Sequence, residues 1–478
     1  MALIHITPTS PYRDFIASRQ KESPCISNLS SFLTPSHFLP PNSSQLYAVD
    51  FLPKTRPVRP LHHNDLASTI ASLPAKGGRI IVIEDLHPSA LDILGPKLDI
   101  DPIFFADYVV TDLEDPQNSP APPSVALTPS QILAQKDAFH IHYQQIVNLT
   151  SIGRFDEFPW VLKTYGNVPR SVRRLPQEKY DEPQLGIVRG CCSILTRKFP
   201  DSWIAIILID STTTRIISRN PQTRTINIDQ TPFHSNSEFL PHHRSSFSQF
   251  VSSNPSLSLN PSSSSSNPLL NYILSSLTSL PIKEGFTVPT PLDLALHCLL
   301  TPIINSWMIY SQISSNILKR SEFLTTSSTS FSDPQIISLQ KWRHRLIQSR
   351  HKLTATKEYI EHHSSSQSQP SSILILKDLT HLLDKLERYS RALDRIIPVA
   401  PALVQVHDHR RAVADQVFVK RLTYIAFVFV PASWVAAVFS MADEYGPGEA
   451  KFWVYFAITM PFCAVLVLGS FVVGWVGT

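Results

Sequence analysis

Two long apolar runs near the C-terminal end constrain this chain more than any other feature. Residues 422–441 and 452–476 contain no Asp, Glu, Lys, Arg or His. A helix rises about 1.5 Å per residue, so about 20 residues cross the roughly 30 Å hydrocarbon core of a bilayer. Core helices of soluble proteins seldom lack charge over such a length. The two runs therefore predict two C-terminal transmembrane helices.

The charged residues around these runs predict their orientation. Four basic residues precede the first run, and three acidic residues lie between the two runs. They are Arg410, Arg411, Lys420 and Arg421 before the first run, and Asp443, Glu444 and Glu449 between the runs. Positively charged flanks tend to stay on the cytosolic side of a membrane. We therefore expect a multi-pass protein of the lipid bilayer with a cytosolic N-terminal region and an acidic external loop at 442–451.

The rest of the chain divides by composition. Residues 1–55 are rich in Ser and Pro, which favours a poorly ordered segment. An α/β cytosolic domain is expected over 56–244, and a helical stalk region over 269–421. Between them, residues 245–268 contain five consecutive serines and predict a disordered linker.

Within 56–244, three segments have clear secondary-structure signals. Residues 79–83 follow a Gly-Gly pair and predict a strand, and residues 89–94 predict a short helix. Residues 203–209 are apolar throughout, which predicts a strand buried on both faces. The expected fold class is thus an α+β cytosolic domain, with an α/β N-terminal part and long stalk helices, followed by two transmembrane helices.

The stalk region shows a seven-residue repeat of apolar residues. Asp333-Pro334 favours a helix start, because proline is well tolerated at the first helical position. The repeat then runs through Leu339, Leu346, Leu353 and Ile360. A second helix has the same spacing over 376–397, which predicts long helices packed along each other. Pro398 and Pro401 interrupt the pattern, so a third helix is expected to start near Pro401 and to continue into the first apolar run.

Several classes of function lack their sequence signatures. The chain has 13 Gly and 40 Pro and contains neither of the phosphate-binding motifs GxGxxG and GxxxxGK[ST]. Its net charge of +4, with no interleaving of basic and aromatic residues, argues against a nucleic-acid partner. Five scattered cysteines form no CxxC pair, and no GxSxG or HExxH motif indicates a hydrolase. We expect neither an enzyme nor a bound cofactor.

Small residues form a stripe along the first apolar run. At alternating steps of three and four residues the positions are Thr423, Ala426, Val430, Ser433 and Ala437, with Ser440 next. Small residues let membrane helices approach closely, so one interpretation is helix–helix contact. The other interpretation is the wall of a pore in an oligomer. Spacing alone leaves both open.

Short motifs at both ends of the chain resemble one known family. Pro431 lies nine residues before Ser440-Met441-Ala442, after an approach segment at 419–423. The second apolar run opens with Phe-Trp-x-Tyr-Phe at 452–456 and has Pro461 after it. Upstream, 83–86 (IEDL) and 98–105 (LDIDPIFF) complete the set. Together these motifs resemble the CorA-type magnesium transporter family, in particular its divergent fungal branch.

The resemblance implies a CorA-like architecture, a homo-oligomer that is pentameric in that family, and Mg²⁺ or another divalent cation as the transported ion. Ser440, Met441 and Ala442 stand at the family's Gly-Met-Asn signature, where only Met441 matches. The family's asparagine faces the hydrated ion, whereas Ala442 has no side-chain oxygen. Family members also bind regulatory Mg²⁺ through cytosolic acids, for which Asp408 and Asp415 are the nearest candidates.

Two hypotheses about function follow. In the first, an oligomer conducts divalent cations, and the acids at 442–451 raise the cation concentration at the pore mouth. In the second, the chain is a non-conducting CorA-like scaffold or regulatory subunit of the membrane, which the degenerate signature favours.

Overall fold

The computed structural model describes residues 10–34, 39–40, 43–52, 55–74, 77–110, 121–149, 162–175, 184–213, 215–218, 225–227, 267–279, 288–326, 333–364, 370–439 and 451–476. The chain divides into two compact units. The first contains Met1–Arg320 and Lys341–Leu393, and the second contains Ser321–Gln340 and Asp394–Thr478.

The first unit is built on a mixed sheet of ten described strands. Their bounds are β1 (Gln45–Phe51), β2 (Val58–Leu61), β3 (Gly77–Glu84), β4 (Ala138–Asn148), β5 (Leu162–Thr164), β6 (Ser171–Arg174), β7 (Leu185–Lys198), β8 (Ser202–Ile209), β9 (Arg215–Ser218) and β10 (Thr225–Asn227). The order is β10-β9-β5-β6-β7-β8-β3-β1-β2, and β4 pairs with β7. The long strand β7 pairs with β4 on one edge and with β6 and then β8 on the other.

The centre of the sheet is the parallel pair β3 and β8, with Ile81 opposite Ile206. Both strands are nearly continuous apolar sequences, GGRIIVIE and SWIAIILI, and every residue of β3 is buried. Strands of this composition require cover on both faces. The sequence-based expectation of strands at 79–83 and 203–209 is therefore confirmed.

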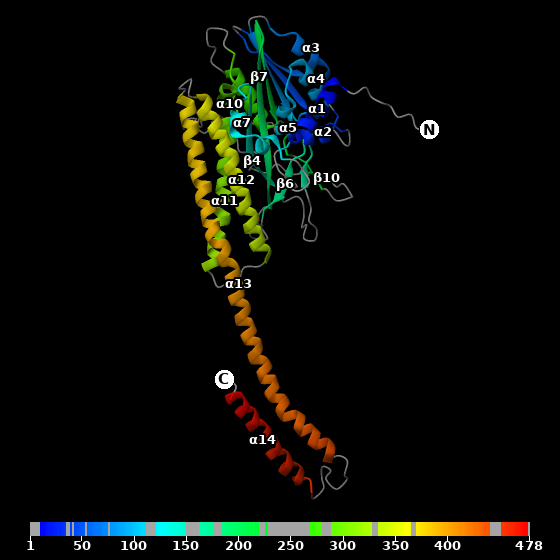
Figure 1. Ribbon diagram of the computed structural model, residues 1–478, viewed down its shortest axis with the longest axis vertical. Helices are drawn as coiled ribbons and strands as arrows, with labels where there is room; N and C mark the ends of the chain where they lie inside the picture. Colours follow the sequence, from blue (N-terminus) through cyan, green and yellow to red (C-terminus); the bar gives the residue numbers. More distant parts are fainter. Residues whose placement is uncertain are drawn as a thin grey trace, which may run out of the picture. The chain divides into compact units, whose positions relative to one another are not determined.

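Helices cover both faces of this sheet (Figure 1). One face packs against α1 (Pro11–Glu22), α2 (Ser27–Leu33), α3 (Leu66–Ala71), α4 (Pro88–Lys97) and α5 (Pro102–Val109). The other face lies beneath α10 (Pro291–Cys298) and those parts of α11 (Leu300–Thr326), α12 (Asp333–Ser364) and α13 (Pro370–Phe439) that belong to the first unit. Helix α9 (Pro268–Ser279) contacts α10.

The N-terminal residues differ from the sequence-based expectation. Residues 1–55 were expected to be poorly ordered, but α1, α2 and β1 lie within them. Tyr12 and Ile16 are buried one helical turn apart, and the Tyr12 hydroxyl donates a hydrogen bond to the Ile100 carbonyl at 2.5 Å. Arg13 forms an ion pair with Asp92 at 2.6 Å. The Ser- and Pro-rich composition concealed a short apolar stripe that completes the core.

Helix α12 begins at the predicted Asp333-Pro334 pair and buries a seven-residue repeat. The buried positions that follow this repeat are Leu339, Trp342, Leu346, Ser349, Leu353, Thr356 and Ile360, and Tyr359 is buried beside them. Helix α13 continues the same pattern through Leu379, Leu382, Leu386, Leu393 and Ile396. The regular alternation of three- and four-residue steps is the spacing of helices packed lengthwise.

The expected break at Pro398 and Pro401 is wrong, because α13 runs as one helix from Pro370 to Phe439. A proline inside a helix removes the N–H bond to the carbonyl four residues earlier. Ile396 and Ala400 are buried on either side of Pro398, and this packing holds the segment helical.

The second apolar run forms α14 (Trp453–Val476). Among the residues that the structure describes, no single helix satisfies both the length and the apolar composition of a membrane span. One bent pair, Pro291–Cys298 with Leu300–Thr325, satisfies them jointly and meets at 59°. The predicted linker at 245–268 lies outside the described residues except for its last two positions.

The buried repeat of α13 predicts that buried and exposed apolar positions on this helix contribute very differently to stability. Leu386→Ala removes a side chain that is 1% exposed and should cost about 2–5 kcal/mol of unfolding free energy. Ile373→Ala, at a position that is half exposed on the same helix, is the matched control and should lower stability much less. Thermal unfolding of the full chain in detergent micelles, followed by circular dichroism, measures both. Equal losses would contradict the assignment of the buried face.

Candidate functional site

The residues predicted at the pore mouth lie outside the part of the chain that the structure describes. Ser440, Met441, Ala442, Asp443, Glu444 and Glu449 all fall within 440–450, between α13 and α14. The expected acidic loop at 442–451 is described only at Lys451. Their roles remain predictions from the sequence.

The predicted small-residue stripe lies along the last five turns of α13. Thr423, Ala426, Val430, Ser433 and Ala437 are all exposed in the single chain. The Thr423 hydroxyl donates to the Val419 carbonyl at 2.9 Å, and the Ser433 hydroxyl donates to the Val430 carbonyl at 2.8 Å. Each hydroxyl is thus satisfied by its own helix, which lets a polar residue sit on an apolar helix without an outside partner.

Large apolar side chains around this stripe are exposed as well. On α13 they are Leu422, Ile425, Phe429, Trp434 and Val438, and on α14 they are Trp453, Phe456, Met460, Val465 and Leu468. The exposed fraction reaches 69% for Phe429 and 70% for Met460. Extended apolar surfaces of this kind mark contacts with lipid or with other chains.

The two candidate regulatory acids, Asp408 and Asp415, lie seven residues apart on α13 and are exposed. Within the described residues, no group of three or more His, Cys, Asp or Glu side chains is arranged to hold a metal ion. The structure therefore places both acids on one helix but brings neither into a ligand cluster within a single chain.

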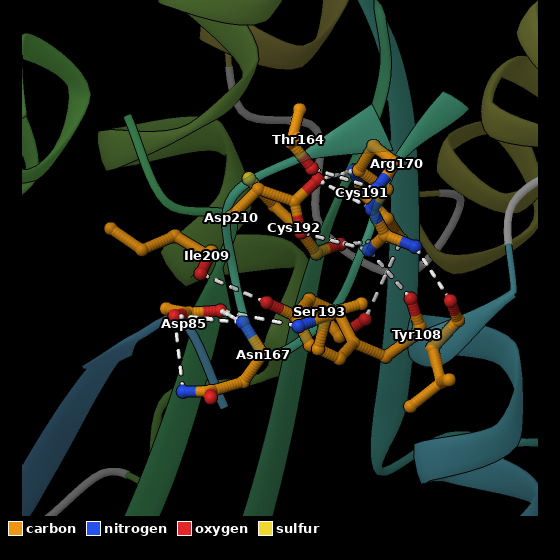
Figure 2. A network of polar contacts seen from close by, with 12 residues as sticks. Asp85, Tyr108, Thr164, Asn167, Arg170, Cys191, Cys192, Ser193, Ile209 and Asp210 are labelled. Atoms are coloured by element: carbon orange, nitrogen blue, oxygen red, sulfur yellow. Dashed lines mark hydrogen bonds and ion pairs between the residues drawn. The ribbon is translucent and has the colours of Figure 1, made fainter. Parts of the chain in front are cut away.

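A buried polar network in the first unit was not found by sequence reasoning. Figure 2 shows it at the carboxyl ends of β3 and β8, where Asp85 and Asp210 directly follow the two parallel strands. Carboxyl ends of parallel strands are the usual place for functional residues in α/β sheets. The only sequence signal was an acid immediately after each apolar strand.

Arg170 and Asp210 form the strongest contact in this network. The guanidinium donates through Nε and Nη2 to the two carboxylate oxygens of Asp210, at 2.9 and 2.8 Å. Two further N–H donors reach the Val109 and Tyr108 carbonyls, both at 2.7 Å, and the Cys191 amide donates to Asp210 at 3.0 Å. Burial alone would lower the pKa of Arg170, but the adjacent Asp210 carboxylate raises it. Four of the five guanidinium donors thus have partners in the network.

Asp85 anchors the loop between β5 and β6. Its carboxylate accepts hydrogen bonds from the Asn167 amide at 2.8 Å, from the Asn167 side chain at 3.1 Å and from the Val168 amide at 3.3 Å. Its backbone has a φ of 59°, in the left-handed region, where aspartate is tolerated better than most residues. Burial raises the pKa of Asp85 to about 6, against the lowering effect of these hydrogen bonds.

One cluster in this unit contains the residue types of a hydrolase triad. Ser193 Oγ lies 2.6 Å from His140 Nδ1, and His140 Nε2 lies 4.0 Å from Asp107 Oδ2. The second distance is too long for a hydrogen bond, and Ser193 is fully buried. The cluster therefore offers no accessible nucleophile in this structure.

Comparison with known proteins identifies the helical part of the chain. Residues 266–474 match the family model described as CorA-like Mg²⁺ transporter protein. No curated protein matches the sequence. The family match confirms the resemblance that the motifs at 419–461 predicted.

Two solved structures are similar over most of the chain. The CorA magnesium transporter from Methanocaldococcus jannaschii is 12% identical, with 91% of this chain and 98% of that chain covered and a TM-score of 0.36. The full-length CmaX protein is 13% identical, with 89% and 96% covered and a TM-score of 0.34.

The Arg170–Asp210 pair predicts a large loss of stability when one partner is removed. Arg170→Met leaves a buried carboxylate without its cation and should cost about 3–5 kcal/mol of unfolding free energy. Adding Asp210→Asn should recover part of this loss, because the buried charge is then gone. Arg391→Met, which removes an exposed partner of Glu387, is the control and should cost under about 1 kcal/mol. Chemical denaturation in detergent measures all three, and a loss for Arg170→Met as small as the control's would contradict a structural role.

Proposed function

We propose that this chain, whose residues 266–474 form a domain of the CorA-like Mg²⁺ transporter family, conducts Mg²⁺ or another divalent cation across a membrane as a homo-oligomer. The family match is the observation that carries the proposal. The sequence supports it, because it contains neither GxGxxG nor GxxxxGK[ST], the phosphate-binding motifs that would suggest nucleotide-driven transport.

The membrane part of the proposal consists of spans at 422–441 and 452–476. Both runs lack charged residues, and the large apolar side chains described on α13 and α14 are exposed. Transfer of such side chains from water into a bilayer lowers the free energy by about 25 cal/mol for each Å² of apolar surface removed from water. Lipid is thus a favourable environment for these two helices.

The proposed orientation places the sheet domain in the cytosol and the acidic loop at 442–451 outside. Arg410, Arg411, Lys420 and Arg421 lie on the cytosolic side in this arrangement. Asp443, Glu444 and Glu449, repeated around an oligomer, concentrate cations at the pore mouth. A divalent ion moving inward gains roughly 4–5 kcal/mol per 100 mV of membrane potential, twice the value for a single charge.

The pore wall in this proposal is the small-residue stripe from Thr423 to Ala437, with Ser440 and Met441 at its outer end. Mg²⁺ gives up its water reluctantly, so a filter selects it through oxygens that hydrogen-bond to the hydration shell. Ala442 has no side-chain oxygen, which leaves the Ser440 hydroxyl as the one side-chain oxygen of the signature Ser440-Met441-Ala442. By resemblance the oligomer is a pentamer, and Asp408 and Asp415 bind regulatory Mg²⁺ between neighbouring stalks.

The second candidate is a non-conducting scaffold or regulatory subunit of the same family. It is favoured by the signature Ser440-Met441-Ala442, which retains only one of three family residues. The two candidates share the fold and the membrane location and differ in flux alone.

Ion flux tests the first candidate directly. The full chain, reconstituted into vesicles loaded with a Mg²⁺-sensitive dye, should show Mg²⁺ uptake above empty vesicles that increases with an inside-negative potential. At low salt, uptake should be lower when Asp443, Glu444 and Glu449 are replaced by their amides. The difference from the wild type should shrink at high salt, because salt screens the acidic loop of the wild type. No uptake of Mg²⁺, Ni²⁺ or Co²⁺ above empty vesicles would exclude the transporter and leave the scaffold.

The signature itself predicts the effect of one substitution. Ala442→Asn supplies an amide that can hydrogen-bond to the waters of the ion and should raise Mg²⁺ flux about fivefold to tenfold, which corresponds to one added hydrogen bond. Ala442→Leu has a similar size and no oxygen, so it should give no increase. Flux raised equally by both variants would show that side-chain volume, and not an oxygen, sets the rate.

A further inference from the structure

A second buried polar cluster joins helix α12 to the edge of the sheet in the first unit. We name it the histidine junction. Its members are Asp107 on α5, Ser124 on α6 (Pro123–Ala126), His140 and His142 on β4, Ser193 on β7 and Lys352 on α12. None of these residues has a part in the proposed ion pathway.

His142 is the contact between the sheet and α12. Its Nε2 lies 3.2 Å from Lys352 Nζ, which also donates to Ser124 Oγ at 2.7 Å. A lysine ammonium can only donate, so His142 Nε2 accepts and the ring proton resides on Nδ1. That Nδ1 is buried and has no hydrogen-bond partner among the described residues. The imidazole is therefore held in its neutral form, with its lone pair directed at a cation.

His140 is neutral for related reasons. Its Nδ1 lies 2.6 Å from Ser193 Oγ, and the centroids of its ring and the Phe104 ring are 5.1 Å apart. The buried Nε2 has no hydrogen-bond partner among the described residues, and the Asp107 carboxylate is 4.0 Å away. Asp107 instead accepts a hydrogen bond from the Ser124 amide at 2.9 Å.

Burial and the nearby cations oppose protonation of both rings. Burial lowers the pKa of His142 well below its ordinary value, and the cations Lys352, Arg189 and Arg170 and the neighbouring His140 lower it further. Burial also lowers the pKa of His140; Asp107 raises it in part, and Lys352 lowers it. These groups come from α5, α12, β7, the loop before β6 and β4 itself.

Other contacts also join α12 to β4. Tyr359 stacks on Phe139 with ring centroids 4.0 Å apart, and its hydroxyl donates to the Ala138 carbonyl at 3.1 Å. The ring of His363, also on α12, stacks on Tyr359 with centroids 4.1 Å apart. The Gln144 side chain donates to Ser349 at 3.5 Å.

His142 is thus the histidine of β4 that contacts α12. His140 instead contacts Ser193 on β7 and Phe104 on α5.

We propose that the histidine junction is an acid-sensitive lock, which holds α12 against β4 at neutral pH and releases it in a mildly acidic solution. The docked helix is α12 of the same chain, and protonation releases it. The inference is independent of ion transport, so it can stand or fail separately from the proposed function.

The direction and size of the effect follow from linkage. When α12 is undocked and His142 is solvated, its pKa returns to about 6.5, whereas the ring stays unprotonated in the docked state. The undocked state therefore takes up a proton as the pH falls through 6.5, and docking loses stability there. From pH 7.5 to 5.5 His142 favours undocking about tenfold.

Hydrogen–deuterium exchange of the full chain in detergent micelles tests this proposal. After correction for the intrinsic pH dependence of exchange, the protection of amides at 345–360 should fall about tenfold between pH 7.5 and 5.5. In the variant His142→Gln this acid dependence should vanish. Gln places an oxygen near the position of Nε2, so Lys352 keeps an acceptor.

The matched control is His351→Gln, at an exposed histidine next to Lys352 on the same helix. It should behave like the wild type. Unchanged protection in the wild type, or an equal fall in the His142→Gln variant, would overturn the proposal. If His142→Gln fails to fold at pH 7.5, His142→Asn, which also lacks a group that titrates near pH 6.5, decides the matter in the same way.

Discussion

The parallel pairing of β3 and β8 is the constraint on which the first unit depends. Both strands are apolar on both faces, so neither face of the sheet centre can meet water. Helices α1–α5 satisfy one face, and the helices that follow α9 satisfy the other. This requirement explains why residues 10–34 and the parts of α11, α12 and α13 in the first unit, far apart in sequence, belong together.

Polar residues in this unit occur where elements must be held in register. Asp210 and Arg170 tie the end of β8 to the loop before β6, and Asp85 ties the end of β3 to the same loop. His142 and Lys352 tie β4 to α12. Arg170 and Asp210 are opposite charges that stabilise each other, whereas Asp85 is held by amide N–H groups and His142 is an imidazole that must remain neutral. Because burial raises the pKa of Asp85 to about 6, mild acid acts on the Asp85 contact as well as on the His142 contact.

The features that were predictable from the sequence are local. The strand at 203–209 and the helix start at Asp333-Pro334 follow from runs, caps and repeats within a single segment. The networks were not predictable, because Arg170 and Asp210 are 40 residues apart and Lys352 and His142 are 210 apart. The α1 segment was missed because only Tyr12, Ile16 and a few later residues interrupt a polar composition. The family resemblance was visible because its motifs have fixed spacing along the chain.

Helix α13 changes its surroundings near residue 400, and this change bears on the membrane proposal. Up to Ala400 the heptad positions are buried, whereas Val406, Val413 and Val417 continue a similar spacing with about half of each side chain exposed. An apolar seam that is exposed in one chain requires another helix, because a long isolated helix gains little stability from its own hydrogen bonds. The same helix then enters the charge-free run at 422–441, in which Leu422, Ile425, Phe429, Val430, Trp434 and Val438 are exposed. In the proposed homo-oligomer, neighbouring stalks would cover the apolar seam and lipid would cover the apolar end of the helix, so one arrangement accounts for both exposures.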